Sequence, residues 1–185
     1  MLIHDAIFTQ AAQALRNGRT VAYPTEAVWG VGCDPDNTTA LERLLALKQR
    51  DPAKGVILIA GDIDQFAPWL EGLAPELYAL LLASWPGPVT WLVPDNGRTH
   101  PLVRGQHDCV ALRVSAHPGV QQLTHAFGGP IVSTSANLAG CPPLMSADAV
   151  TKELGHDLFI VPGALGGRDR PSDIRDLQSG DYLRQ

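Results

Sequence analysis

Three positively charged side chains lie just before the most apolar segment of this sequence. The stretch LKQRDPAKGVILI, residues 47–59, contains Lys48, Arg50 and Lys54, and the chain has only three lysines in all. Cations in the last turn of a helix complement its dipole and often do nothing more, which is a sufficient explanation for Lys48 and Arg50. Lys54 lies directly before an apolar strand and favours an anion site, because three cations on one loop would suit a polyphosphate.

Arg113 interrupts the apolar run CVALRV at residues 109–114. A guanidinium is costly to bury without a partner. Arg113 therefore either pairs with an internal carboxylate or presents its planar fork to a carboxylate or phosphate of a ligand. The sequence leaves both interpretations open.

Hydroxyl and amide side chains follow two further predicted strands. Pro24-Thr25-Glu26 comes after one of them, and STSANLAG, residues 133–140, comes after the other. Such residues favour turns because they bond to the nearby backbone, so STSANLAG alone fits an ordinary turn as well as a ligand contact. Ligands of α/β folds usually bind at the carboxyl ends of strands, and the combination with Arg113 favours a binding site.

The composition restricts the class of protein. A length of 185 residues predicts a single domain over residues 1–185. The net charge of −5 argues against non-specific coating of nucleic acid, but it permits a local basic cleft. Neither a signal-peptide pattern nor an apolar run of about 20 residues is present, so we expect a soluble, cytoplasmic protein without a membrane span.

Several common site motifs are absent from the sequence. It contains no P-loop, no G-x-G-x-x-G and no G-x-S-x-G. The three cysteines are widely spaced without a C-x-x-C, which indicates neither a zinc site nor a disulfide framework. His117-Pro118 is more typical of a helix entry than of a catalytic base.

Helices and short buried strands alternate along the chain, which predicts an α/β domain with a parallel or mixed sheet. We expect helices over residues 5–17, 37–48, 62–70, 75–84, 118–127 and 146–154, and strands over residues 20–23, 56–60, 89–93, 109–114, 131–133, 159–161 and 182–184. Asn37 or Thr39 is the expected cap of the second helix. Residues 94–108 are polar and predict a surface loop.

A set of motifs in fixed order carries a resemblance to a known family. The segments are AYPTEAVWGVGCDPDN, LKQRDPAKGVILIA, WPGPVTWLVP, VALRVSAHP, PIVSTSANLAGCPP and RPSDIRD followed by YLRQ. Together they closely resemble the YrdC/TsaC family, the threonylcarbamoyl-AMP synthases, over nearly the whole chain. The resemblance implies a twisted, largely parallel or mixed α/β sheet, flanked by helices, with a positively charged concave cleft.

The resemblance also implies an activity and its partners. Family members form threonylcarbamoyl-AMP and pyrophosphate from L-threonine, bicarbonate or CO2, and ATP. A tRNA-modifying threonylcarbamoyl transferase complex then uses the adenylate at tRNA position 37, and the resemblance leaves room for weak direct tRNA binding. Mg²⁺ is expected with ATP, although no carboxylate cage is evident in the sequence.

Site residues follow from the resemblance position by position. The catalytic set is Lys48, Arg50, Ser135 and Asn137, from the K-x-R and S-x-N motifs. The ATP contacts are Arg50, Lys54, Cys109, Ser135, Pro143 and Arg184. The threonine contacts are Thr25, Arg113, Ser133 and Ser172. Cys109 and Pro143 could act only through backbone or packing.

The sequence departs from the longer relatives at two points. Ile59 stands where many of them have a histidine near the threonine, and we expect no counterpart of their additional C-terminal domain. Two other functions remain as alternatives. One is a non-catalytic RNA-binding module that uses the same basic cleft, and the other is a carbamoyl-adenylate-forming domain like that of hydrogenase-maturation carbamoyltransferases.

Overall fold

One mixed β-sheet forms the centre of the protein. The computed structural model describes residues 3–184, with side chains from residue 6 to residue 183. Within these residues nine strands join in the order β7-β1-β2-β6-β3-β5-β4-β8-β9. The strands are β1 Val21–Pro24, β2 Trp29–Gly32, β3 Ile57–Ala60, β4 Val89–Pro94, β5 Cys109–Val114, β6 Ile131–Ser135, β7 Phe159–Ile160, β8 Asp173–Asp176 and β9 Tyr182–Arg184. The pairs β1–β7, β3–β5 and β4–β8 are parallel, and the other neighbours are antiparallel.

The helices begin and end at residues that favour those positions. They are α1 Ile3–Arg16, α2 Thr38–Leu47, α3 Ala67–Leu70, α4 Pro75–Ser84, α5 Pro101–Arg104, α6 Pro118–Phe127 and α7 Ala147–Leu154, with 3-10 turns η1 Pro52–Lys54 and η2 Ile63–Phe66. The side chain of Asn37 accepts from the Ala40 N–H and caps α2, so Asn37 rather than Thr39 is the cap. No helix within the described residues is long and apolar enough to cross a membrane.

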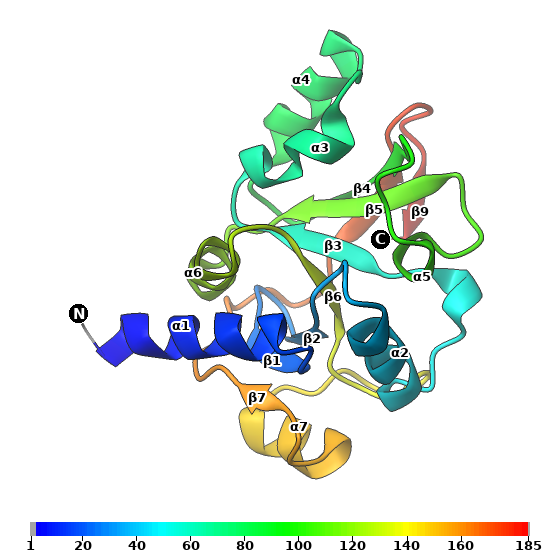
Figure 1. Cartoon of the computed structure of the whole chain (residues 1–185). Coiled ribbons are helices and arrows are strands. Elements are labelled where there is room, and N and C mark those ends of the chain that lie inside the picture. The colour runs from blue at the N-terminus through cyan, green and yellow to red at the C-terminus, as the bar shows by residue number, and fades with distance from the viewer. Residues whose placement is uncertain (1–2, 185) are drawn as a thin grey trace.

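The two faces of the sheet are covered differently. On one face Leu58, Leu112 and Val132 pack into a core cluster that includes the apolar side of α2. On the other face Ile59 and Ile131 pack against α1 and α6, which lie side by side in Figure 1. Since successive side chains of a strand point to opposite faces, each strand contributes to both layers. The remainder of the second face bounds a cavity.

Three predicted segments differ from the structure. Strands β2 and β8 were not expected, and β2 in particular has the sequence WGVG, in which two glycines mask the strand signal. A Cβ atom at Gly32 would lie 1.9 Å from the carbonyl oxygen of Val132, so the close approach of β6 requires glycine there. The expected surface loop over residues 94–108 contains the short helix α5, whose residues Val103 and Arg104 line the cavity.

Candidate active site

The floor of the cavity is one face of the central strands. The cavity has a volume of about 470 Å³, within the range of small-molecule sites. Its lining includes Cys109, Ala111 and Arg113, which alternate along β5 and therefore share one face. Ile57 and Ile59 of β3 lie directly beside Ala111 and Arg113 in the parallel register. The run CVALRV thus places its polar and small residues toward the cavity and its valines and leucine toward the core.

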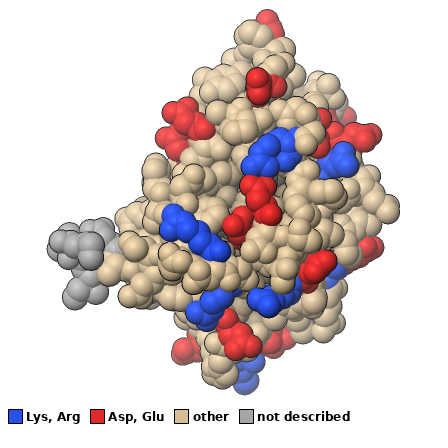
Figure 2. Space-filling view, viewed as in Figure 1, with Lys and Arg blue, Asp and Glu red and all other residues tan. Residues whose placement is uncertain are grey.

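The walls carry charge of one sign. Among the described residues of the lining, Arg50, Lys54, Arg104 and Arg113 are the cations, and there is no Asp or Glu. By contrast, Lys and Arg side chains are interspersed with Asp and Glu over the face seen in Figure 2. An enclosed group of cations without lining carboxylates attracts anionic ligands.

Lys48 and Arg50, two residues apart, have different positions. Gln49 between them has φ 50°, a left-handed conformation that is uncommon for residues other than glycine. The backbone therefore turns sharply after α2. Lys48 is only 3% exposed and does not line the cavity, whereas Arg50 does. The Nε of Arg50 donates to the Gly55 carbonyl at 2.9 Å, which ties its guanidinium to the next loop.

The ammonium group of Lys48 holds the segment after β6. It donates to the carbonyl oxygens of Ser135 and Asn137, and to Oδ1 of Asn137 at 3.2 Å. Asn137 Nδ2 in turn donates to the Cys141 carbonyl at 2.6 Å. Within each motif the two residues therefore have separate tasks. Lys48 and Asn137 hold the loop, while Arg50 and Ser135 line the cavity.

The surroundings of Lys48 disfavour its charge. Burial, and then the nearby charge of Arg50, lower the pKa of the Lys48 ammonium from 10.5 to about 8. The three acceptors around Nζ favour the protonated form, since only an ammonium offers three N–H donors. The charge of Lys48 is therefore sensitive to mildly alkaline pH.

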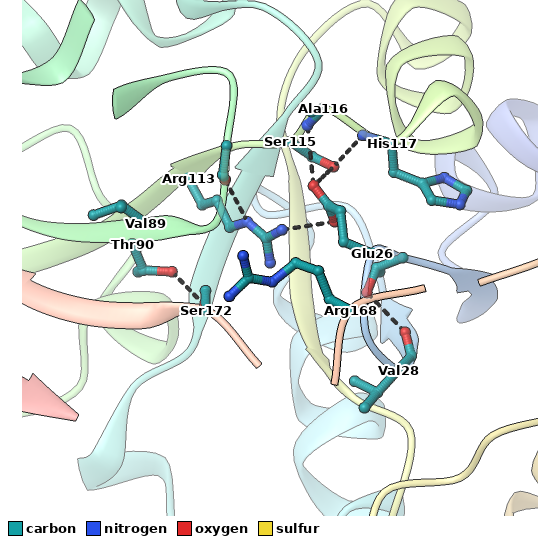
Figure 3. Close-up of polar contacts among 12 residues, drawn as sticks. Glu26, Val28, Val89, Thr90, Arg113, Ser115, Ala116, His117, Arg168 and Ser172 are labelled. Atoms are coloured by element: carbon teal, nitrogen blue, oxygen red, sulfur yellow. Dashed lines mark hydrogen bonds and ion pairs between the residues drawn. The ribbon is translucent and has the colours of Figure 1, made fainter. Parts of the chain in front are cut away.

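Arg113 has both of the environments that the sequence left open. It lines the cavity, and its Nη2 forms an ion pair of 2.6 Å with Oε2 of Glu26. Its Nε donates to the Gly87 carbonyl at 3.1 Å. Figure 3 shows the guanidinium beside Glu26, with one of its terminal nitrogens pointing away from Glu26. The pairing with Glu26 fixes the orientation of the guanidinium in the cavity wall.

Glu26 joins the site to the start of α6. Its Oε1 accepts from the Ser115 hydroxyl at 2.9 Å and from the Ala116 N–H at 3.0 Å. Burial would raise the pKa of the Glu26 carboxyl, but the charge of Arg113 and these hydrogen bonds outweigh burial and hold that pKa below its usual value. Glu26 is therefore ionised at neutral pH and keeps Arg113 in place.

The residues predicted to contact threonine line the same cavity. Thr25, Arg113, Ser133 and Ser172 all line it. The Thr25 hydroxyl donates to the Val28 carbonyl at 2.7 Å, so its lone pairs remain as acceptors. Ser172 and Thr90 share a hydroxyl–hydroxyl bond of 2.9 Å.

Residues 164–168 lie beside Thr25 and Glu26, where three described contacts hold them. The Gly166 N–H donates to the Thr25 carbonyl at 3.0 Å, and the Arg168 N–H donates to the Glu26 carbonyl at 2.9 Å. The third contact joins Nε2 of His117 and the Ala164 carbonyl at 3.0 Å. His117 also caps α6 through its Nδ1, as expected for a helix entry.

The nucleotide-side predictions have mixed positions. Arg50, Lys54, Cys109, Ser135 and Pro143 line the cavity. Burial, followed by the nearby carboxylates, raises the pKa of the Cys109 thiol, so it remains protonated and serves as packing. Arg184 belongs to β9, but its side chain is outside the described part of the structure.

Sequence reasoning missed Arg104 and His107, which both line the cavity. They lie in the segment that was predicted to be a surface loop. A local signal was present, because His100-Pro101 repeats the His-Pro helix entry of α6 and Gly105 follows α5 in a left-handed conformation. That pattern identifies α5 but not the side of the molecule to which it docks.

The side chains do not form a cage for a metal ion. Within the described residues no group of three or more His, Cys, Asp or Glu side chains is placed to hold one. The described residues of the lining also include no carboxylate, the ligand that Mg²⁺ prefers. The residues present therefore do not fit a protein-held Mg²⁺.

Comparisons with known proteins show the family of this chain. Threonylcarbamoyl-AMP synthase of Chromohalobacter salexigens is 64% identical over 175 residues, 95% of each chain. The protein of the same name from Serratia proteamaculans is 50% identical over 182 residues, 97% of this chain and 96% of that one. The expected family resemblance is thereby confirmed.

Solved structures share the fold. The crystal structure of P. abyssi Sua5 complexed with L-threonine has a TM-score of 0.86 and 28% identity, and it covers 95% of this chain. The present chain spans about half of that longer protein, 52%. E. coli YciO, with a TM-score of 0.85 and 22% identity over 98% of this chain and 89% of that one, supports the fold alone. The Sua5/YciO/YrdC family model, described as "Telomere recombination", matches residues 13–185, and the chain therefore belongs to this family.

Proposed function

We propose that this protein is a threonylcarbamoyl-AMP synthase, an enzyme that transfers a nucleotidyl group. Its substrates would be L-threonine, bicarbonate or CO2, and ATP, and its products threonylcarbamoyl-AMP and pyrophosphate. The observation that carries the proposal is the cavity, which Arg113 and several hydroxyl groups line together with Arg50 and Lys54. The names of the relatives and the threonine bound to P. abyssi Sua5 support the same function.

The chemistry asks for positioning and charge stabilisation. The amine of threonine attacks CO2 and loses a proton to solvent, which gives a carbamate anion. A carbamate oxygen then attacks the α-phosphorus of ATP, the bond to the β-phosphate oxygen breaks, and its electron pair leaves with pyrophosphate. Negative charge gathers on the phosphate oxygens in the transition state, and fixed cations in a partly enclosed site stabilise it most effectively.

Each cavity residue has a task in this scheme. The guanidinium of Arg113, oriented by Glu26, would bind the threonine carboxylate. The Thr25 hydroxyl has free lone pairs and would accept a hydrogen bond from the bound threonine. Arg50 and Lys54 would neutralise the phosphates, and Lys48 with Asn137 would hold the loop that presents Ser135.

Mg²⁺ would accompany ATP as a counter-ion of its phosphates. The cavity lining contains no carboxylate among the described residues, so the phosphates would hold the ion. The product adenylate is a mixed anhydride, so an enzyme that transfers its acyl group must consume it. The acceptor of this acyl group would be tRNA, in a threonylcarbamoyl transferase complex.

The alternative of a passive RNA-binding module has less support. An RNA backbone requires an extended basic surface, whereas the cations here lie around a cavity and charges of both signs are mixed on the face in Figure 2.

Pyrophosphate release from ATP tests the proposed function. We expect release that requires both L-threonine and bicarbonate, with threonylcarbamoyl-AMP detected by mass spectrometry. Omission of either substrate should reduce the rate to background. Release that is independent of threonine, or salt-sensitive RNA binding without any ATP turnover, would contradict the proposal.

A further inference from the structure

Arg104 is a cation of the cavity lining that the mechanism above does not use. It is the last residue of α5, and its side chain is 36% exposed. We propose that Arg104 binds the β- and γ-phosphates of the nucleotide, the part that departs as pyrophosphate. The inference rests on the proposed function for the identity of the nucleotide.

The backbone around Arg104 is locked to the loop before β3. The Val56 N–H donates to the Val103 carbonyl at 2.8 Å, and the Gln106 N–H donates to the Ala53 carbonyl at 3.0 Å. A Cβ atom at Gly55 would lie 2.6 Å from the Arg104 carbonyl oxygen, and one at Gly105 would lie 2.5 Å from the Ala53 carbonyl oxygen. Both glycines have positive φ, so the two segments interlock only because neither has a side chain there.

The same junction carries the other phosphate-side cations. Lys54 immediately precedes Gly55, and Arg50 donates through Nε to the Gly55 carbonyl. The interlock therefore holds Arg50, Lys54 and Arg104 at one rim of the cavity, which all three line. Three cations gathered by backbone contacts form a preorganised site for a multiply charged anion.

The guanidinium of Arg104 forms only a long ion pair, without a hydrogen bond to a carboxylate. Its only described carboxylate neighbour is Asp95, with 3.7 Å from Nη1 to Oδ2, which is too long for a hydrogen bond. Asp95 already accepts from both the N–H and the hydroxyl of Thr99. The Nε of Arg104 is buried and has no hydrogen-bond partner among the described residues.

Arg98 is an arginine of this protein with a structural role. Its two terminal nitrogens bond to both carboxylate oxygens of Asp36 at 2.9 and 2.8 Å, and its guanidinium lies 4.7 Å from the Trp69 ring centre. Arg104 has no such bidentate partner within the described residues. A phosphate group would supply acceptors that the protein does not.

Gly55, at this rim, and Arg113, the proposed threonine contact, lie at different levels along the sheet. Ile57 pairs with Ala111 and Ile59 pairs with Arg113, so Arg113 lies four residues beyond the level of Gly55. Two residues of strand, from Ile57 to Ile59, span roughly 7 Å, and Gly55 lies a further two residues before β3 begins. An amino acid at Arg113 and a triphosphate that extends toward Gly55 would fill this length.

Binding of inorganic pyrophosphate and AMP, measured by calorimetry, tests the inference. We expect Arg104→Ala to weaken pyrophosphate binding about tenfold or more and to raise the KM for ATP by a similar factor. AMP affinity and the KM for threonine should change less than twofold. Arg104→Lys should restore part of the pyrophosphate affinity. Arg43→Ala, which removes an exposed arginine of α2, is the matched control and should bind as the unmodified protein does.

The outcomes separate this inference from the proposed function. Unchanged pyrophosphate affinity and ATP KM in a folded Arg104→Ala variant would overturn the inference, and so would a loss of AMP affinity with pyrophosphate binding intact. If the unmodified protein forms no threonylcarbamoyl-AMP but its pyrophosphate binding depends on Arg104, the subsite stands and the proposed reaction fails.

Discussion

Replacing Lys48 with methionine tests whether this residue acts through the loop that it holds. Methionine keeps a similar unbranched length but removes the ammonium that donates to Ser135 and Asn137. The side chain is 3% exposed, so the apolar substitute remains buried without a charge to desolvate. The change therefore removes the hydrogen bonds and little else.

The expected magnitude follows from the contacts that are lost. Hydrogen bonds to charged groups contribute roughly 1.5–3 kcal/mol each to stability. Ser135 and Asn137, which carry the acceptors, are half-buried, so water can replace part of the lost bonding and the set of three contributes less than their sum. We expect the ordered loop to lose about 2–3 kcal/mol, which corresponds to a roughly 30- to 140-fold change in the opening equilibrium.

Hydrogen exchange monitored by mass spectrometry gives the direct readout. The amides of Ala139, Cys141 and Leu144 are bonded within this loop or to Lys48, so their protection reports its order. We expect Lys48→Met to lose protection over residues 136–145 and to lower kcat/KM at least tenfold, with global unfolding at nearly the same temperature.

Two results would refute this reasoning. Unmodified activity in Lys48→Met would remove any role for the residue. Lost activity with unchanged exchange over residues 136–145 would show that Lys48 acts directly on the ligand rather than through the loop.

Three further perturbations have definite expected outcomes. First, activity should fall as pH rises through about 8, the pKa to which burial and Arg50 lower the Lys48 ammonium. The free energy of unfolding should not fall over the same pH range. The folded protein loses this proton at a lower pH than the unfolded chain, whose lysines titrate near 10.4. A pH–rate profile of Lys48→Met that retains the same alkaline decline would contradict this assignment. Second, Glu26→Gln should lower the free energy of unfolding by about 3 kcal/mol, because it leaves the guanidinium of Arg113 buried without its carboxylate. Asp36→Asn, which breaks the exposed pair with Arg98, should cost less than about 1 kcal/mol, and equal losses in thermal denaturation would argue against the buried pair. The lowered pKa of Glu26 predicts that this contribution is complete above pH of about 5 and is lost as pH falls further. Third, Ala111→Leu should block the cavity floor and reduce pyrophosphate release at least a hundredfold without loss of thermal stability, whereas Ala46→Leu on the exposed side of α2 should not affect release. Normal turnover in Ala111→Leu would mean that the reaction occurs elsewhere.

Local sequence patterns were sufficient for most elements and for the floor of the site. The alternation in CVALRV places Cys109, Ala111 and Arg113 on one face because the side-chain period of a strand is two. Asn37, Pro75 and His117 marked helix starts through side chains and ring geometry that act within a few residues. Such signals depend on neighbours in the chain, so they can be read without the fold.

The roles of the charged residues depended on contacts between distant segments. The sequence grouped Lys48, Arg50 and Lys54 as one cationic cluster, but the turn at Gln49 and the carbonyls of residues 135 and 137 direct Lys48 into the loop instead. The carboxylate partner of Arg113 is Glu26, which lies far away in the chain. No local pattern encodes which of several carboxylates a guanidinium will meet.

The sequence by itself determined the family, the order of most elements and the faces of the central strands, because these follow from periodicity and short motifs. Only the tertiary structure decided that Arg104 belongs to the cavity and Lys48 to its support. The reason is physical. The docking of α5 on the loop before β3 depends on Gly55 and Gly105, which are fifty residues apart in the chain. Each of these glycines lies against the backbone of the other segment.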